Sequence, residues 1–299
     1  MRKDVGLPAS FFRDNRNTSF RMCENLIEWN NNRWEERKHM KKAVFFDIDG
    51  TIWDAKMQIP DSTREAIRKL REQGHYAFLC SGRSRSNIRS PKLLELGFDG
   101  MVAACGAHIE FDGKKQFESL LSQEEAAHAL AVLHKHHMPV VLEGPEHIYV
   151  DESEFLDDPY VIYLRNELGD DLRPITGTET YRINKMSAEI GKADVAQFIA
   201  DLGEEFAVIV HAAEGLVEVG KRGFSKATGI ERVCKMLGVR NEDTYAFGDS
   251  ANDLDMLSFV GHGIAMGNGT REAKEAAEYV TAPINQDGIY LGLEHYGLI

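Results

Sequence analysis

The sequence predicts an α/β fold: a Rossmann-like, doubly wound parallel sheet with an α+β domain inserted into it. Short apolar runs alternate with amphipathic segments, which is typical of a parallel sheet with helices on both faces. This alternation is interrupted at about residue 116 by a stretch with more strands than helices, and it resumes near residue 211. Several apolar runs also end abruptly at acidic or hydroxyl side chains, at the edge where open α/β sheets bind ligands.

Length and composition are those of a globular protein of two domains. The 299 residues are 43% hydrophobic and 28% charged, and no apolar run is long enough to span a bilayer. The net charge of −13 disfavours a nucleic-acid partner. The four cysteines contain no Cys-x-x-Cys pair, so we expect neither a disulfide framework nor a zinc site, and a cytoplasmic location.

Residues 1–39 differ from the rest of the chain, since they are rich in Arg and Asn and show no sustained helical or strand period. We expect them to form an N-terminal extension, disordered or created by a mis-assigned start. Trp34-Glu35-Glu36 is encoded TGG-GAR-GAR, which can contain the ribosome-binding sequence GGGAGGA, and three codons separate it from Met40. We hypothesise that translation begins at Met40.

The first half of the core reads as a βαβαβ unit. Apolar runs predict its strands at 43–46, 75–80 and 100–104. The capping residues at 60–63 predict a helix to about Gln73 that Gly74 ends, and a second helix is predicted over 88–96. Such alternation with short connections implies parallel strands and right-handed crossovers.

The inserted module begins with a helix from the capping box at Ser122 to about His137. Strands are predicted at 139–142, 147–150, 181–190, 206–211 and 215–219, and a helix at 192–202. The acidic stretch 151–180 reads as irregular. We place the inserted α+β domain at residues 116–210 and the core domain at 40–115 and 211–299.

The core pattern then resumes. Gly223-Phe224-Ser225-Lys226 precedes a predicted helix that runs to about Leu237, and a strand follows at 244–247 that ends in Gly248-Asp249. A helix opening at Ser250, a strand at 263–266 and a helix at 271–278 complete the chain.

Three aspartates stand at predicted strand ends: Asp47, Asp49 and Asp249, with Asp253 one helical turn beyond the last. Each motif alone could be an Asx turn or a helix cap. Two such strand ends within one βα architecture are hard to explain as unrelated turns. Carboxylate oxygens together with phosphate oxygens are what Mg²⁺ prefers, so the pattern predicts a Mg²⁺ site.

A phosphoryl group beside Mg²⁺ needs donors for its oxygens. Thr51, Ser81 and Lys226 each stand where a predicted strand ends or a helix begins. Lys226 has an alternative interpretation as a solvated lysine at a basic helix entry, together with Lys221 and Arg222.

Four motifs, in order, resemble the haloacid dehalogenase (HAD) superfamily. They are Asp47-Ile48-Asp49-Gly50-Thr51, Ser81-Gly82-Arg83, Lys226, and Gly248-Asp249-Ser250-Ala251-Asn252-Asp253. The position of the insert resembles the Cof-type phosphatase branch, whose members carry an α/β (C2-type) cap between the second and third motifs. One departure is Cys105-Gly106, where the family usually has Asn-Gly before the cap.

The resemblance implies a role for each motif residue. Asp47 attacks the phosphoryl group, and Asp49 protonates the leaving alcohol and then activates water. Mg²⁺ is held by Asp47, the backbone carbonyl of Asp49, and Asp249. The residues that orient these ligands are Asn252 and Asp253, and those that hold the phosphoryl oxygens are Thr51, Ser81, Gly82 and Lys226.

The sequence therefore predicts a Mg²⁺-dependent phosphatase that hydrolyses a small phosphorylated metabolite through an aspartyl-phosphate, with sugar phosphates favoured. Asp49 supports hydrolysis, because relatives that do not hydrolyse phosphate esters have another residue there. Two alternatives are a phosphomutase acting on hexose phosphates and a non-catalytic sensor of phosphorylated metabolites. We expect neither nucleic acid nor membrane as a partner.

Overall fold

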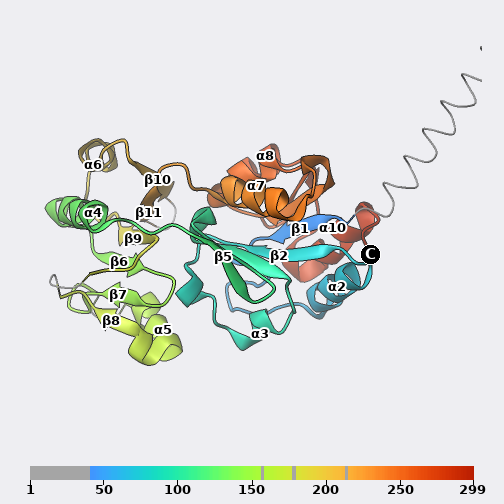
Figure 1. The fold of residues 1–299 in the computed structure, drawn as a ribbon, viewed down its shortest axis with the longest axis horizontal. Coiled ribbons are helices and arrows are strands. Elements are labelled where there is room, and N and C mark those ends of the chain that lie inside the picture. The colour runs from blue at the N-terminus through green and yellow to red at the C-terminus, as the bar shows by residue number, and fades with distance from the viewer. Residues whose placement is uncertain (1–40, 156–157, 177–179, 213–214) are drawn as a thin grey trace, which may run out of the picture. The chain divides into compact units, whose positions relative to one another are not determined.

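The computed structural model describes residues 41–299 apart from 156–157, 177–179 and 213–214 (Figure 1). The expectations for residues 1–39 therefore lie outside the described residues. No helix in the described ranges is long and apolar enough to cross a membrane.

The described chain forms two sheets. The first has eight strands in the order β14-β13-β12-β1-β2-β3-β4-β5, and it is parallel except at β4 and β5. Its strands are β1 (Ala43–Phe46), β2 (Tyr76–Cys80), β3 (Gly100–Ala103), β4 (His108–Phe111), β5 (Lys114–Glu118), β12 (Thr244–Gly248), β13 (His262–Ala265) and β14 (Tyr279–Val280). The predicted α/β class with a parallel core sheet is confirmed.

Helices cover both faces of this sheet. Their bounds are α2 (Asp61–Glu72), α3 (Pro91–Leu94), α7 (Lys226–Leu237), α8 (Leu254–Phe259), α9 (Arg271–Ala276) and α10 (Gly288–His295). One apolar cluster joins the sheet to α2, α3 and α10, and a second joins its other face to α7, α8 and α9. Successive residues of β1 serve the two faces, since Phe46 stacks on Phe247 at 5.2 Å and Phe45 on Phe78 at 5.4 Å.

Two local features differ from the sequence prediction. The helix expected over 88–96 is a single α-helical turn, α3, preceded by a 3₁₀ turn at Arg85–Asn87. The core sheet also gains an antiparallel hairpin, β4–β5, whose turn is Asp112-Gly113 with positive φ at both residues. An Asp-Gly pair between alternating segments is a strong hairpin signal that could have predicted it.

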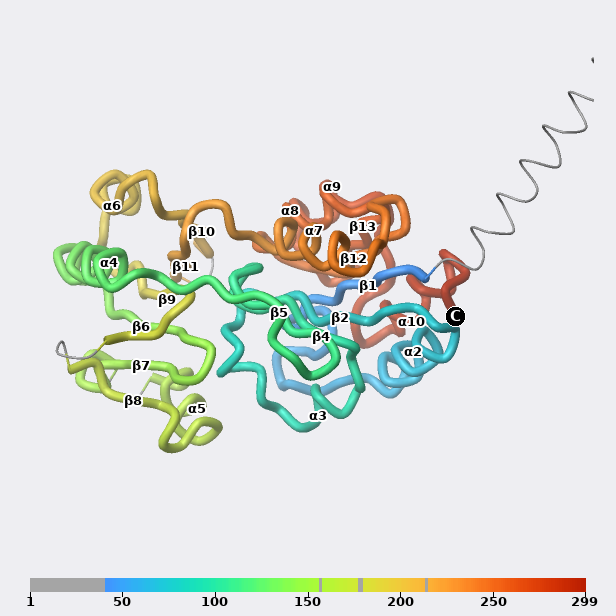
Figure 2. The backbone as a smooth tube through the Cα atoms, viewed as in Figure 1, coloured from blue at the N-terminus to red at the C-terminus, as the bar shows by residue number. Residues whose placement is uncertain are grey.

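The second sheet has six strands in the order β10-β11-β9-β6-β7-β8. They are β6 (Val140–Glu143), β7 (Ile148–Val150), β8 (Leu172–Pro174), β9 (Lys185–Glu189), β10 (Phe206–His211) and β11 (Leu216–Lys221). Helices α4 (Gln123–Lys135) and α6 (Val195–Leu202) pack on one face, and α5 (Pro159–Leu168) packs on the other. Figure 2 follows the chain through this α+β domain, the cap.

Helix α5 lies in the stretch predicted to be irregular, so that prediction was wrong. Asp158 caps it by accepting from the Val161 N–H, and Pro159 occupies the first helical position, which together form a recognisable start signal.

The cap sheet also continues beyond the predicted end of the insert at residue 210, because β11 pairs with both β9 and β10. Strand β5 belongs to the core sheet up to Glu118. From these pairings we propose that the cap comprises residues 119–221.

Strands β2, β1 and β12 are parallel neighbours in register, with Phe46 opposite both Leu79 and Phe247. The residues that come after them along the chain therefore emerge together at one edge of the sheet. This edge carries the predicted acids and phosphoryl donors.

Candidate active site

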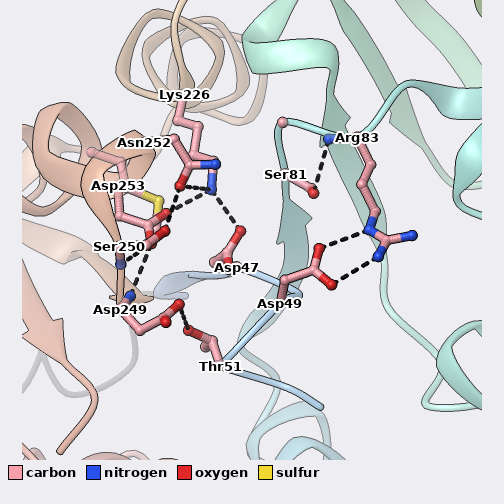
Figure 3. Close-up of polar contacts among 12 residues, drawn as sticks. Asp47, Asp49, Thr51, Ser81, Arg83, Lys226, Asp249, Ser250, Asn252 and Asp253 are labelled. Carbon is pink, nitrogen blue, oxygen red and sulfur yellow. Dashed lines mark hydrogen bonds and ion pairs between the residues drawn. The ribbon is translucent and has the colours of Figure 1, made fainter. Parts of the chain in front are cut away.

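Asp47 follows directly on β1 and lies at the centre of the site (Figure 3). Its N–H donates to the carbonyl of Phe247 at 3.0 Å, which extends the pairing of β1 with β12. The residue is only 3% exposed. Burial and the neighbouring Asp253 raise the pKa of Asp47 well above its ordinary value, although the Lys226 ammonium acts in the opposite direction.

Lys226, the first residue of α7, places its positively charged ammonium beside the Asp47 carboxylate. Its Nζ donates to Asp47 Oδ1 and to Asp253 Oδ1, both at 2.6 Å. The capping box formed by Ser225 and Thr228 fixes the start of the helix that carries it. Because the lysine is 1% exposed, its interpretation as a solvated surface residue is wrong.

Asp253 is fully buried and its carboxylate is occupied by protein donors. Oδ1 accepts from Lys226, and Oδ2 accepts from the backbone N–H groups of Asp249 and Ser250 at 2.8 and 3.0 Å. This carboxylate therefore fixes the backbone of Asp249 and the ammonium of Lys226. The prediction that Asp253 orients other groups of the site is therefore kept as a proposal.

Asp249 follows β12, and its carboxylate stands next to that of Asp47. Burial and the Asp253 charge raise the pKa of Asp249 to about 7. Thr51 Oγ1 donates to Asp249 Oδ1 at 3.3 Å, so Thr51 contacts this acid in the structure. One carboxylate oxygen each of Asp47, Asp249 and Asp253 lies within 4.8 Å of the others.

This donor set fits a divalent cation. Two raised carboxyl pKa values at one spot mean that the buried acids lack positive charge beyond that of Lys226. Oxygen ligands of this kind suit Mg²⁺. Because Asp253 is already occupied, Asp47 and Asp249 are the carboxylates available to such an ion.

The turn after β1 packs closely against Asp249 and requires glycine. Gly50 has φ of +79°, and a Cβ at this position would lie 2.3 Å from Asp249 Oδ2. The side chain of Asn268 donates to the Gly50 carbonyl at 2.8 Å and holds the turn from the other side. Glycine is thus needed both for the backbone conformation and for the approach of Asp249.

Asp49 faces away from the acidic cluster, toward the end of β2. Arg83 Nε donates to Asp49 Oδ2 at 2.7 Å, Arg83 Nη2 donates to Oδ1 at 2.8 Å, and the Trp53 indole N–H donates to Oδ1 at 2.8 Å. The Asp49 side chain is 53% exposed, so its carboxylate is only partly desolvated. Partial desolvation would raise its pKa, but the hydrogen bonds and charge of Arg83 prevail and hold the pKa of Asp49 below its ordinary value.

The other predicted residues surround this centre. Ser81 follows β2 and is 2% exposed, and its Oγ accepts from the Arg83 N–H at 3.1 Å. The Gly82 carbonyl accepts from Lys185 of the cap at 3.0 Å. Asn252 Oδ1 accepts from Ser250 Oγ at 2.9 Å and from Lys226 at 3.5 Å.

Besides Asn268, three residues with contacts in this region were not predicted from the sequence. Arg83 and Trp53 bind Asp49, and Lys185 reaches the loop after β2 from the cap. Arg83 was part of a motif but had no assigned role. Trp53, four residues after Asp49, carries no comparable signal in the sequence, and the position of Lys185 depends on how the two domains pack.

Comparison with known proteins agrees with this geometry. The profile of the haloacid dehalogenase-like hydrolase family matches residues 44–293. The Bacillus subtilis protein named "Putative phosphatase YkrA" is 34% identical over 264 residues, covering 86% of this chain and 98% of the relative. The 5-amino-6-(5-phospho-D-ribitylamino)uracil phosphatase YitU of the same organism is 29% identical over 265 residues, covering 85% and 96%.

Solved structures with a similar fold also include a phosphatase of the HAD superfamily. The structure described as the HAD subclass IIB sugar phosphatase BT4131 has a TM-score of 0.75 and 27% identity, and covers 87% of this chain and 100% of that one. A protein from Geobacillus kaustophilus has a TM-score of 0.74 and 31% identity with the same coverage. The chain belongs to the haloacid dehalogenase-like hydrolase family and is an enzyme of its Cof-type phosphatase branch.

Proposed function

We propose that this protein is a Mg²⁺-dependent phosphatase that hydrolyses a small phosphorylated metabolite through an aspartyl-phosphate on Asp47. One observation carries the proposal: buried Asp47 lies beside both Lys226 and a second strand-end acid, while Asp49 is held apart from them. This separates a proposed nucleophile, paired with the Lys226 ammonium and set beside a second carboxylate, from a group able to exchange protons with a leaving alcohol and with water.

In the first step, a carboxylate oxygen of Asp47 attacks phosphorus while the bond from phosphorus to the alcohol oxygen breaks. The leaving oxygen takes a proton from Asp49. For this step Asp49 must be protonated and must leave Arg83, because the pair in this structure favours the carboxylate. Lys226 supplies a fixed positive charge that offsets the charge of the entering phosphoryl group.

In the second step, Asp49 acts in the ionised form favoured here. It takes a proton from water as the water oxygen attacks phosphorus, and the bond to Asp47 breaks to release inorganic phosphate. We propose that Ser81 and the Gly82 backbone N–H, which follow the adjacent strand β2, donate to phosphoryl oxygens. Thr51, which bonds to Asp249 here, is the remaining proposed phosphoryl donor.

Asp47, the backbone carbonyl of Asp49, and Asp249 would hold Mg²⁺, with Asn252 and Asp253 orienting the surrounding groups. When bound, Mg²⁺ supplies positive charge that keeps the acids ionised and offsets the charge of the phosphoryl oxygens.

For the substrate we propose a phosphate ester of a sugar or a related polyol. The relatives support this choice: BT4131 is described as a sugar phosphatase, and the substrate named for YitU carries its phosphate on a ribityl chain. The main alternative is a phosphomutase, which would return an isomerised sugar phosphate. The match to hydrolases speaks against a non-catalytic sensor.

Assays of phosphate release test this proposal. We expect Mg²⁺-dependent release of inorganic phosphate from para-nitrophenyl phosphate and from members of a panel of sugar and polyol phosphates. Asp47→Asn should abolish it. An isomerised sugar phosphate without net phosphate release would favour the mutase, and an Asp47→Asn variant with near wild-type activity would overturn the mechanism.

A further inference from the structure

A buried group of charged residues in the cap has no part in the proposed chemistry. Lys185 on β9 is 5% exposed and Glu143 on β6 is 2% exposed, and they are opposite each other in the sheet. Lys185 Nζ lies 2.9 Å from Glu218 Oε2 on β11 and 3.5 Å from Glu143 Oε1. Ser187, two residues along β9 and on the same face, donates to Glu143 at 2.6 Å.

This group contacts the loop after β2. Lys185 Nζ donates to the Gly82 carbonyl at 3.0 Å, and Glu143 Oε2 accepts from the Ser84 N–H at 3.4 Å. A Cβ at Gly82 would lie 3.3 Å from Glu218 Oε2, so the loop backbone lies close against the cap. Residues 82 and 84 of the core are therefore hydrogen-bonded by side chains from the neighbouring cap strands β9 and β6, and Glu218 of β11 lies close to Gly82.

The cost of burying the Lys185 ammonium makes its contact with Gly82 important. A buried ammonium is costly unless ion pairs and hydrogen bonds satisfy it. Burial lowers the pKa of Lys185, but Glu143 and Glu218 outweigh burial and keep the pKa above its ordinary value. The charged Lys185 ammonium needs hydrogen-bond acceptors, and the Gly82 carbonyl of the core domain is one of them. If the Gly82 carbonyl moved away, a buried N–H of the ammonium would be left without this acceptor.

This loop is the proposed phosphate loop, since Ser81 and Gly82 are proposed to hold the phosphoryl oxygens. We propose that Lys185 is a positioning residue: from the cap, it fixes the Gly82 peptide so that Ser81 and Gly82 can bind the phosphoryl group. This inference rests on the proposed function. It makes phosphoryl binding in the core depend on a cap side chain that need not touch the substrate.

The variant Lys185→Met/Glu218→Gln tests the inference. Glu143, Lys185 and Glu218 together carry a charge of −1, and the double variant retains −1 on Glu143, so no additional buried charge is created. The readout is the inhibition constant of inorganic phosphate against para-nitrophenyl phosphate hydrolysis with Mg²⁺ present. Both compounds probe the phosphoryl site and contain no sugar for the cap to recognise.

We expect the double variant to raise the phosphate inhibition constant at least tenfold, as loss of a charged hydrogen bond that fixes the loop implies. Ser187→Ala is the matched control. It removes the hydrogen bond from Ser187 to Glu143, which belongs to the same group of residues but does not involve the loop. It should therefore change the phosphate inhibition constant less than twofold. Glu218→Gln alone, which retains the Lys185 contact to Gly82, should resemble this control.

A folded double variant with a wild-type phosphate inhibition constant would overturn the inference. If thermal denaturation shows that the double variant does not fold, Lys185→Arg decides by the same readout, because its charge is kept while its planar donors cannot occupy the Nζ position. An unchanged constant in Lys185→Arg would then overturn it. Failure of the proposed function itself is distinct, because the wild-type protein would then show no phosphate-inhibited hydrolysis.

Discussion

Asp47 and Asp49, separated by a single residue, have opposite electrostatic surroundings. Burial and neighbouring acids raise the pKa of Asp47, whereas Arg83 outweighs burial and lowers the pKa of Asp49. The cause is geometric: along the chain after β1, Asp47 faces Lys226 and Asp249 while Asp49 faces the end of β2 (Figure 3). The different roles that we propose for the two carboxyls rest on these surroundings.

Gly50 offers the sharpest test at the scale of one residue. Gly50→Ala should lower activity by at least a hundredfold, because its Cβ would displace Asp249. Gly113→Ala is the matched control, since Gly113 has φ of +67° with open space around its Cβ position. Both variants should lose about 1 kcal/mol or more of unfolding free energy from backbone strain. Equal activity of the two variants in a phosphatase assay would contradict this account.

Residue patterns predicted part of this site. Acids after apolar runs correctly indicated that Asp47 and Asp249 meet at one sheet edge, because strand alternation fixes where strand ends lie. The pairing of Asp49 with Arg83 and Trp53 was not predictable, since it depends on side-chain conformations in the turns after β1 and β2.

At the scale of elements, helix α7 connects stability to the site. Its capping box at Ser225 fixes the first turn, and Lys226 is the first residue of that turn. Helix α4 in the cap has a capping box of the same kind at Ser122, with no catalytic residue beside it. The two caps therefore form a natural comparison.

Ser225→Ala and Ser122→Ala should each cost about 1 kcal/mol of unfolding free energy, measured by denaturant titration. Only Ser225→Ala should also reduce kcat/KM, by roughly tenfold, because it loosens the backbone that places Lys226 against Asp47 and Asp253. A loss of activity in Ser122→Ala equal to that in Ser225→Ala would show that general destabilisation is the cause.

Elements were predicted where their local signals are strong. The helix expected after Lys226 and up to about Leu237 is present as α7, which begins at Lys226 itself. The capping box at Ser122 was predicted correctly because the cap and the apolar periodicity agree there. Helix α5 and the β4–β5 hairpin were missed although Asp158-Pro159 and Asp112-Gly113 carry local signals for them. In both cases acidic or charged neighbours concealed the periodicity.

At the scale of the whole molecule, the proposed binding of Mg²⁺ by the acidic cluster would be linked to stability. Burial and Asp253 raise the pKa of Asp249 to about 7. A carboxyl whose pKa is higher in the folded than in the unfolded state favours folding less as pH rises from about 4 to about 7. Without metal, the protein should therefore lose stability over this pH range because of Asp249.

Thermal denaturation of Asp249→Asn tests this link. At about pH 8 in the presence of a chelator, the variant should melt above the wild-type protein, because a buried acid that must ionise is gone. Added Mg²⁺ should stabilise the wild-type protein, by about 2.7 kcal/mol at a hundredfold excess over Kd, and should have little effect on the variant. If Mg²⁺ raised the melting temperature of both proteins equally, Asp249 would not be a ligand of the proposed Mg²⁺ site.

The change in pattern correctly predicted a core sheet with an inserted α+β domain, and the later second boundary is our proposal from the pairing of β11. The sequence predicts strand β11 close to the point where the chain returns to the core domain. Its pairing with β9 and β10 in the structure assigns it to the cap sheet. Pairing partners in antiparallel sheets depend on contacts distant in sequence, which local periodicity does not specify.

The proposed mechanism requires that Asp47 becomes phosphorylated during turnover. Protein quenched during hydrolysis of a phosphate ester and reduced with borohydride should contain homoserine in place of Asp47, detected by mass spectrometry of the peptide that contains β1. Asp49→Asn, which retains the nucleophile, serves to identify the modified residue. Modification at another aspartate, or active turnover with Asp47 always unmodified, would contradict the account.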